Sequence, residues 1–152
     1  MGTTKGVGTP KGGPDSDILA TKAESVTRCL ERIEAHLPAS VAELESDYDA
    51  QDIISLNLQR AVQLCVDMAS YIVAEKGWGS PATMAESFQA LAEHKLIEAD
   101  LADRLKRAVG FRNVSVHEYD RIDWVLVYEV ITTRLDDFRS FISGVYRGTE
   151  TE

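Results

Sequence analysis

The side chains best suited to chemistry lie close together in one segment, residues 111–119, with the sequence FRNVSVHEY. Four of these side chains, those of Arg112, Asn113, His117 and Tyr119, can donate hydrogen bonds or move protons. If the segment is helical, Asn113 and His117 are one turn apart on one stripe. Arg112 and Tyr119, seven residues apart, share the neighbouring stripe. The spacing therefore predicts that both stripes face one cleft.

These residue types suit the cleavage of RNA by its own 2′-hydroxyl. The reaction needs a group that takes the hydroxyl proton, a group that protonates the leaving 5′-oxygen, and positive charge beside the phosphorane. A histidine such as His117 performs either proton transfer near neutral pH. The fork of Arg112 donates two parallel hydrogen bonds to phosphate oxygens, and Asn113 could orient the imidazole or hold the ribose.

The spacing alone also fits a bland alternative. A single Arg near a single His is often a surface cation beside a satisfied helix end. Acid and base roles are easiest with two histidines, and this segment contains only His117. A symmetric dimer would bring a second His117 to the same cleft.

The overall charge restricts where a nucleic acid could bind. The net charge of the 152-residue chain is −9, which argues against the whole surface as a phosphate binder. Residues 104–121 are the exception, because five basic residues there accompany only two acidic ones. We expect either a local anion site or a basic, solvated helix face.

The hydrophobic pattern predicts an all-α domain. Apolar residues recur at the 3.6-residue period and nowhere alternate with period two. We expect an antiparallel bundle of about five helices over residues 17–146. The predicted helices cover residues 17–37, 50–76, a short segment that starts at Pro81 with Ser80 as its cap, a segment from about residue 98, and a segment from a cap at Asp120 or Asp123 to about residue 142.

The ends of the chain and the cysteines carry no function in this reading. Residues 1–16 are expected to be a disordered leader or a cloning remnant, and residues 147–152 a disordered tail. Cys29 and Cys65 sit in apolar helical rows, which favours buried free thiols. No apolar run is long enough for a membrane span and no secretory signal is visible, so we expect a cytoplasmic protein.

Residues 110–113 (GFRN) and 116–119 (VHEY) resemble the R-x-x-x-x-H-x-Y signature of the HepT-like HEPN family. The order of the predicted helices also resembles that family over about residues 17–146. Asp67, inside an apolar row of the second helix, and residues 88–93 (FQALAE) fall where the family has comparable segments. One position differs, because relatives usually have an apolar residue where this chain has Ser115.

The resemblance implies a homodimeric HEPN bundle that acts as a metal-independent endoribonuclease toxin with no cofactor. Arg112, Asn113 and His117 from two chains would line its cleft. It also implies an antitoxin, a minimal nucleotidyltransferase of the MNT type, that silences the toxin by attaching AMP to Tyr119. The alternative is a HEPN module without catalytic activity that only presents its surface and Tyr119 to such a nucleotidyltransferase.

Several other residues are candidates for minor roles. Asp67 is a possible partner that orients Arg112 or His117, or else a surface acid beside Gln63 and Arg60. For Ser115 a solvated position is favoured over a phosphate contact. His36 and His94 lack metal-ligand partners at a known spacing, so no metal site is expected. Trp124 and Tyr128 are expected to pack in the core or a dimer contact.

Overall fold

The structure is a computed structural model that describes residues 15–150. The predicted leader therefore lies outside the described residues except for Asp15, which caps the first helix, and Ser16, which begins it. All regular structure in the described range is helical, which confirms the all-α prediction. None of the described helices is long and apolar enough to cross a membrane.

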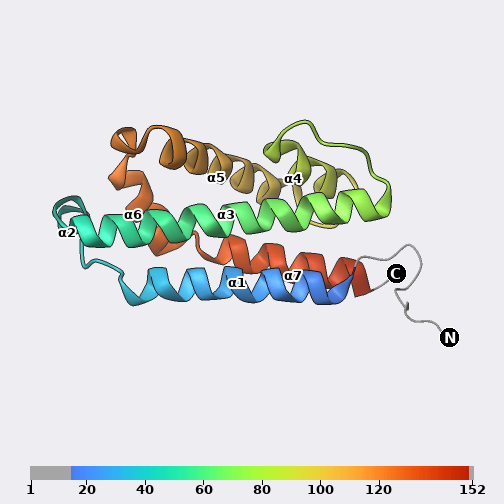
Figure 1. Cartoon of the computed structure of the whole chain (residues 1–152), viewed down its shortest axis with the longest axis horizontal. Coiled ribbons are helices and arrows are strands. Elements are labelled where there is room, and N and C mark those ends of the chain that lie inside the picture. Colours follow the sequence, from blue (N-terminus) through green and yellow to red (C-terminus); the bar gives the residue numbers. More distant parts are fainter. Residues whose placement is uncertain (1–14, 151–152) are drawn as a thin grey trace.

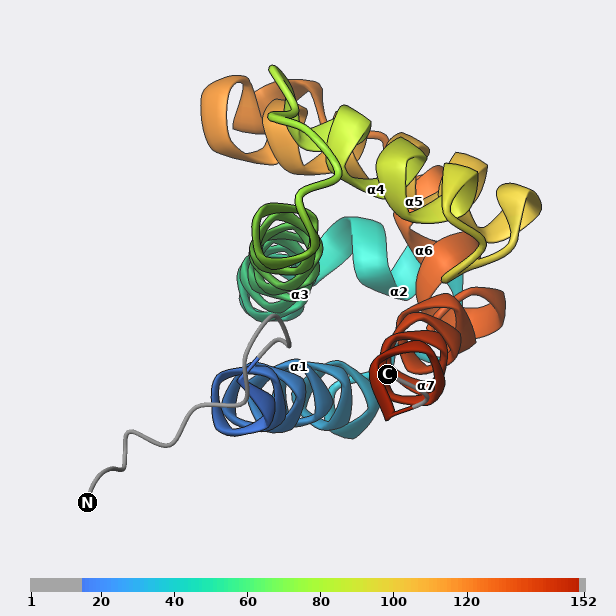
Figure 2. The ribbon, with the colours of Figure 1, turned by 90° about the vertical axis from the view of Figure 1, so that its right-hand side faces the viewer.

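Four long helices run in alternating directions and form the bundle (Figure 1). They are α1 (Ser16–Ala35), α3 (Tyr48–Lys76), α5 (Ala99–His117) and α7 (Asp136–Glu150). α3 packs against α1 on one side and against α4 and α5 on the other, and α7 lies across the bundle from α3; Figure 2 shows this arrangement end-on. The shorter elements are α2 (Val41–Ser46), α4 (Met84–Glu93), the 3₁₀ turn η1 (Tyr119–Arg121) and α6 (Trp124–Thr133).

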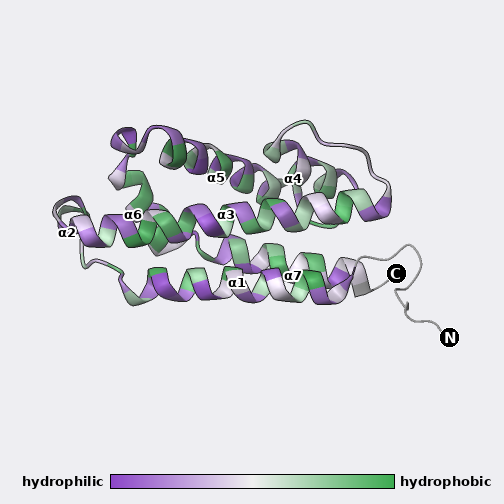
Figure 3. Cartoon of the chain, viewed as in Figure 1, coloured by the Kyte–Doolittle hydropathy of each residue, from purple (hydrophilic) through white to green (hydrophobic). Residues whose placement is uncertain are grey.

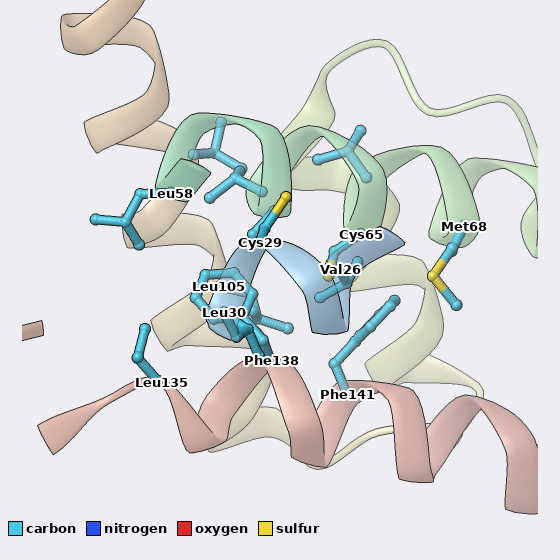
Figure 4. Packing of buried hydrophobic residues seen from close by; sticks show 14 of the residues in the cluster. Val26, Cys29, Leu30, Leu58, Cys65, Met68, Leu105, Leu135, Phe138 and Phe141 are labelled. Carbon is cyan, nitrogen blue, oxygen red and sulfur yellow. The ribbon is translucent and has the colours of Figure 1, made fainter. Parts of the chain in front are cut away.

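The core lies where the apolar stripes of these helices meet. Coloured by hydropathy, the ribbon shows mixed green and purple turns along each long helix, as expected of amphipathic elements (Figure 3). Figure 4 shows side chains from α1, α3, α5 and α7 packed together, with Cys29 and Cys65 among them. Both cysteines are free and buried, which confirms their predicted role as small core residues.

Two helices begin at a variant of the capping box that was not among the predictions, in which the glutamate accepts from the N–H of the residue before the N-cap. Ser40 accepts from the N–H of Glu43 (3.1 Å) while Glu43 accepts from the N–H of Ala39 (2.8 Å), and α2 forms where a polar connection was predicted. Thr83 and Glu86 form the same arrangement, so α4 begins at Met84 and not at Pro81, the start predicted from a cap at Ser80.

The predicted fifth helix is two helices, α6 and α7. Residues 130–133 (VITT) form a β-branched run, which has low helix propensity. Thr132 and Thr133 donate to carbonyls of the preceding turn, and Arg134 then leaves helical geometry (φ −124°, ψ 3°). α7 restarts at Asp136 and continues to Glu150, so residues 147–150, predicted as disordered tail, are helical.

Candidate active site at the end of α5

The candidate site is carried by the last two turns of α5 and by η1. Leu101, Leu105 and Val109 anchor the buried face of α5, and the helix continues through Gly110 to His117. It ends where the N–H of Glu118 donates to the carbonyl of Val114 (2.7 Å). Figure 1 shows this end of α5 on the same side of the molecule as α2 and the start of α3.

Arg112 is half-buried and lacks an acidic partner in the described part of the chain. Its Nη1 donates to Oδ1 of the neighbouring Asn113 (3.1 Å). Its Nε is buried and has no hydrogen-bond partner among the described residues. A buried, charged donor without an acceptor is costly, so this guanidinium is suited to an anion that supplies the missing oxygen atoms.

The other basic residues of this region are mostly neutralised. Arg104 pairs with Asp137 (3.0 Å), Lys106 with Asp103 (3.3 Å) and Arg121 with Glu118 (2.9 Å). Arg107 and Arg112 form no ion pair within residues 15–150. The predicted basic stretch therefore offers its free positive charge at these two arginines.

His117, the last residue of α5, is exposed and makes no hydrogen bond or ion pair within the described residues. The other two histidines differ, because the Nδ1 atoms of His36 and His94 both lie 2.9 Å from the carbonyl four residues before them. Both ring nitrogens of His117 are thus available to a ligand. Asn113, one turn earlier and also exposed, lies on the same stripe of α5, as the spacing predicts.

Ser115 is buried, so the favoured prediction of a solvated position is wrong. Its hydroxyl donates to Oε1 of Gln59 on α3 at 3.0 Å. This contact turns the Ser115 face of α5 toward α3 and leaves the opposite face, with Asn113 and His117, toward solvent. A polar residue is tolerated at this buried position because its partner satisfies it.

Tyr119 does not continue the stripe of Arg112, because α5 has already ended. It lies in η1, and its hydroxyl donates to Oδ1 of Asp52 near the start of α3 at 2.7 Å. Ser55 donates to the same hydroxyl at 3.4 Å, and the ring meets that of Trp124 edge-on. Burial raises the pKa of Tyr119, the hydrogen bond to Asp52 and its charge raise it further, and Ser55 opposes the rise.

Asp67 makes no hydrogen bond or ion pair with Arg112 or His117 among the described residues, so it does not orient either side chain within the chain. Its Oδ1 accepts from Gln63 (2.9 Å), and its Oδ2 lies 3.9 Å from Nζ of Lys22 on α1. The second prediction for this residue, a polar edge beside Gln63, is confirmed. An acidic residue is tolerated at this edge of the apolar row of α3 because Lys22 of α1 places a positive charge beside it.

An apolar cavity of about 270 Å³ adjoins the site. Phe111, next to Arg112, lines it together with Leu126 and Val130 of α6, and Arg107 and Arg134 are also in its wall. Trp124 and Tyr128 are partly buried against the core, as predicted. Among residues 15–150, no three His, Cys, Asp or Glu side chains are grouped as metal ligands.

The arrangement thus combines an anion-binding group, Arg112, with a proton-transfer group, His117, and an amide, Asn113, on one helix end. Tyr119, a nucleophilic hydroxyl, lies on the following turn beside a carboxylate. Sequence reasoning did not find Asp52, Ser55 or Gln59, because they are 67, 64 and 56 residues from their partners and belong to another helix.

Comparison with known proteins gives a consistent picture. The family model described as "Ribonuclease HepT-like" matches residues 26–145. The chain is 35% identical over 130 residues to the mRNA nuclease HepT of Shewanella oneidensis, covering 86% of this chain and 97% of the relative. It is 27% identical over 128 residues to the tRNA nuclease HepT of Aphanizomenon flos-aquae, covering 84% and 87%.

A solved structure agrees with these sequence matches. It is the tri-AMPylated Shewanella oneidensis HEPN toxin in complex with its MNT antitoxin, with a TM-score of 0.81 and 34% identity. The match covers 86% of this chain and 98% of that one. Sequence, family model and fold therefore agree, and this chain belongs to the HepT-like ribonuclease family.

Proposed function

We propose that this chain is a metal-independent endoribonuclease toxin of a toxin–antitoxin pair, acting in the cytoplasm as a homodimer. The observation that carries the proposal is Arg112, whose half-buried guanidinium has no acidic partner among the described residues. It stands one turn and a half before His117, whose ring is free of protein partners in the same range. The family membership supports ribonuclease chemistry at this place.

In the proposed reaction, the 2′-hydroxyl oxygen of RNA attacks the adjacent phosphorus and the bond to the 5′-oxygen breaks. One histidine takes the hydroxyl proton and another protonates the leaving oxygen. Arg112 holds the charged phosphorane oxygens, and Asn113 positions the ribose or phosphate. The products are a 2′,3′-cyclic phosphate and a free 5′-hydroxyl, and no step needs a metal ion.

A homodimer would supply the second histidine. Exposed apolar side chains near the end of α5 support a dimer contact there: Leu56, Val116, Val125 and Leu126 are 40–56% exposed. In a symmetric dimer with α5 and α6 at the interface, both copies of His117 and Arg112 would border one cleft.

We propose further that an MNT-type nucleotidyltransferase antitoxin silences the toxin by adenylylating Tyr119. The AMP-modified relative in complex with an MNT antitoxin supports this. Tyr119 follows His117 by one short turn, so an attached phosphate would place negative charge and bulk beside the anion site. RNA would then be repelled and blocked.

The experiment that tests the activity uses the purified full-length chain, shown by mass spectrometry to carry no AMP, with total RNA in EDTA. We expect cleavage that leaves 2′,3′-cyclic phosphate ends, and its loss in Arg112→Ala. Arg121→Ala is the matched control, because Arg121 is already paired with Glu118. Intact RNA with the unmodified wild type would favour the alternative, a partner module without catalytic activity.

A further inference from the structure

The contact between Tyr119 and Asp52 joins the turn after α5 to the first turns of α3. The phenolic hydroxyl donates to Oδ1 of Asp52 at 2.7 Å, a short distance typical of a hydrogen bond to a charged acceptor. Asp52 itself is exposed and makes no ion pair within residues 15–150. Its carboxylate is therefore not neutralised by a cation of the described chain.

The hydroxyl is fixed in place but open to a second protein. The ring of Tyr119 contacts that of Trp124 at 6.0 Å between centroids, and Ser55 contacts the phenolic oxygen from α3. The residue nevertheless remains 40% exposed. An enzyme that carries a nucleotide could reach this oxygen while the carboxylate stays in contact with its proton.

We propose that Asp52 is the proton acceptor for the adenylylation of Tyr119, so that the toxin chain supplies the base for its own modification. This inference rests on the proposed function. In the step, the phenolic oxygen attacks the α-phosphorus of ATP and forms an O–P bond. The bond from that phosphorus to the oxygen bridging to the β-phosphate breaks, pyrophosphate leaves, and the phenolic proton passes to Oδ1 of Asp52.

The electrostatics of the contact explain why a base is needed. Partial burial, and after it the hydrogen bond to Asp52 and its negative charge, raise the pKa of Tyr119, so the free phenolate is rarer than for an ordinary tyrosine. Attack through a preformed phenolate is thus disfavoured. A carboxylate already bonded to the proton can remove it while the O–P bond forms, when the phenol becomes strongly acidic.

Asp52 both raises the pKa of Tyr119 and, in this proposal, accepts its proton. These two effects predict opposite changes in the reaction rate of the Asp52→Asn variant, so the variant distinguishes them. The amide can still accept the hydrogen bond, but it has no charge and is a poor base. If reaction required the free phenolate, the variant would react faster, because its Tyr119 pKa would be lower. If Asp52 takes the proton, the variant reacts more slowly.

The first measurement uses an aryl sulfonyl fluoride, a small electrophile that labels tyrosine oxygen, with peptide mass spectrometry of the full chain at neutral pH. We expect Asp52→Asn to slow labelling of Tyr119 by about tenfold or more, with partial rescue in Asp52→Glu. Tyr48, which is 75% exposed, is the internal control and should not change. Equal or faster labelling of Tyr119 in a folded Asp52→Asn chain would overturn the proposal.

A second measurement separates this proposal from the proposed regulation. Radiolabelled ATP and the MNT antitoxin of the Shewanella oneidensis complex are incubated with wild type, Asp52→Asn and Tyr119→Phe. Slower labelling of Asp52→Asn than of wild type supports the base, and equal labelling contradicts it. No labelling of any chain would count against the proposed silencing, and the sulfonyl fluoride result would still decide the role of Asp52.

Discussion

The hydroxyl of Ser115 lies 3.0 Å from Oε1 of Gln59, and this buried contact joins the C-terminal end of α5, which carries the candidate site, to the middle of α3. It is formed one turn after Arg112 and two residues before His117. The contact therefore fixes the rotation of the last turns of α5, and with it the directions in which the candidate catalytic side chains project.

Ser115→Ala should lower the free energy of unfolding by about 1 kcal/mol, because it removes the hydroxyl and leaves the acceptor of Gln59 unpaired. Urea denaturation measures this. Ser140→Ala is the matched control, since Ser140 is exposed in α7 and gains the same helix propensity. Equal stabilities of the two variants would show that the contact contributes nothing.

Asp67→Ala should leave RNA cleavage within about twofold of wild type, as for a surface change away from a site. Asp67 is 41% exposed in its side chain and bonds to Gln63 and Lys22. The rate of cleavage of a labelled RNA checks this. A loss of tenfold or more in rate, on the order of 1.4 kcal/mol in the activation barrier, would contradict this and would indicate that Asp67 acts in the site of a partner chain.

The phenol of Tyr119 should titrate above the ordinary tyrosine pKa, because burial and Asp52 raise it. The difference in phenolate absorbance between wild type and Tyr119→Phe isolates this titration. Asp52→Asn should lower its midpoint, since it removes the negative charge. An unchanged midpoint in Asp52→Asn would contradict the contact.

The raised pKa of Tyr119 also makes the free energy of unfolding depend on pH in the alkaline range. A group whose pKa is higher in the folded state favours folding while it is protonated in both states. The contribution of the Tyr119 hydroxyl is therefore complete below about pH 10 and is lost as the pH rises through the folded pKa. Tyr119→Phe, which cannot ionise, should lack this alkaline loss in denaturant titrations.

Gly110→Ala should stabilise the chain by about 0.5–1 kcal/mol, because Gly110 lies inside α5 with nothing within 4 Å of an added Cβ. Gly144→Ala in α7 is the comparison. There the Cβ would lie 3.1 Å from the backbone oxygen of Leu96 and 3.2 Å from Cγ2 of Ile97. In thermal unfolding, the Tm of Gly144→Ala should be clearly lower than that of Gly110→Ala. The reverse order would contradict the packing of α7.

The helical bundle could be predicted from the sequence because the apolar period of each long helix matches a single buried face. The division between α6 and α7 was missed, since the apolar row from Trp124 to Ile142 keeps its spacing across the break. The break depends on local backbone competition at Thr132 and Thr133, which hydrophobic periodicity does not detect. The boxes Ser40–Glu43 and Thr83–Glu86 were visible signals for α2 and α4.

The site was predictable only as far as one helix determines it. Asn113 and His117 share a stripe because both lie in α5, whereas Tyr119 left the predicted stripe when the helix ended. The contacts of Ser115 and Tyr119 with α3 depend on how two helices pack. Spacing within one segment carries no information on such long-range partners.

The measurement that tests the central claim most directly compares His117→Ala with His94→Ala in RNA cleavage in EDTA, using chains free of AMP. Both histidines lie at the C-terminal end of a helix, but His94 bonds to the carbonyl of Ala90 and stacks on Trp78, whereas His117 has no such partner among the described residues. We expect His117→Ala to lose about 100-fold or more in rate, and His94→Ala to cleave like wild type. Equal cleavage by both variants would contradict His117 as the proton-transfer group.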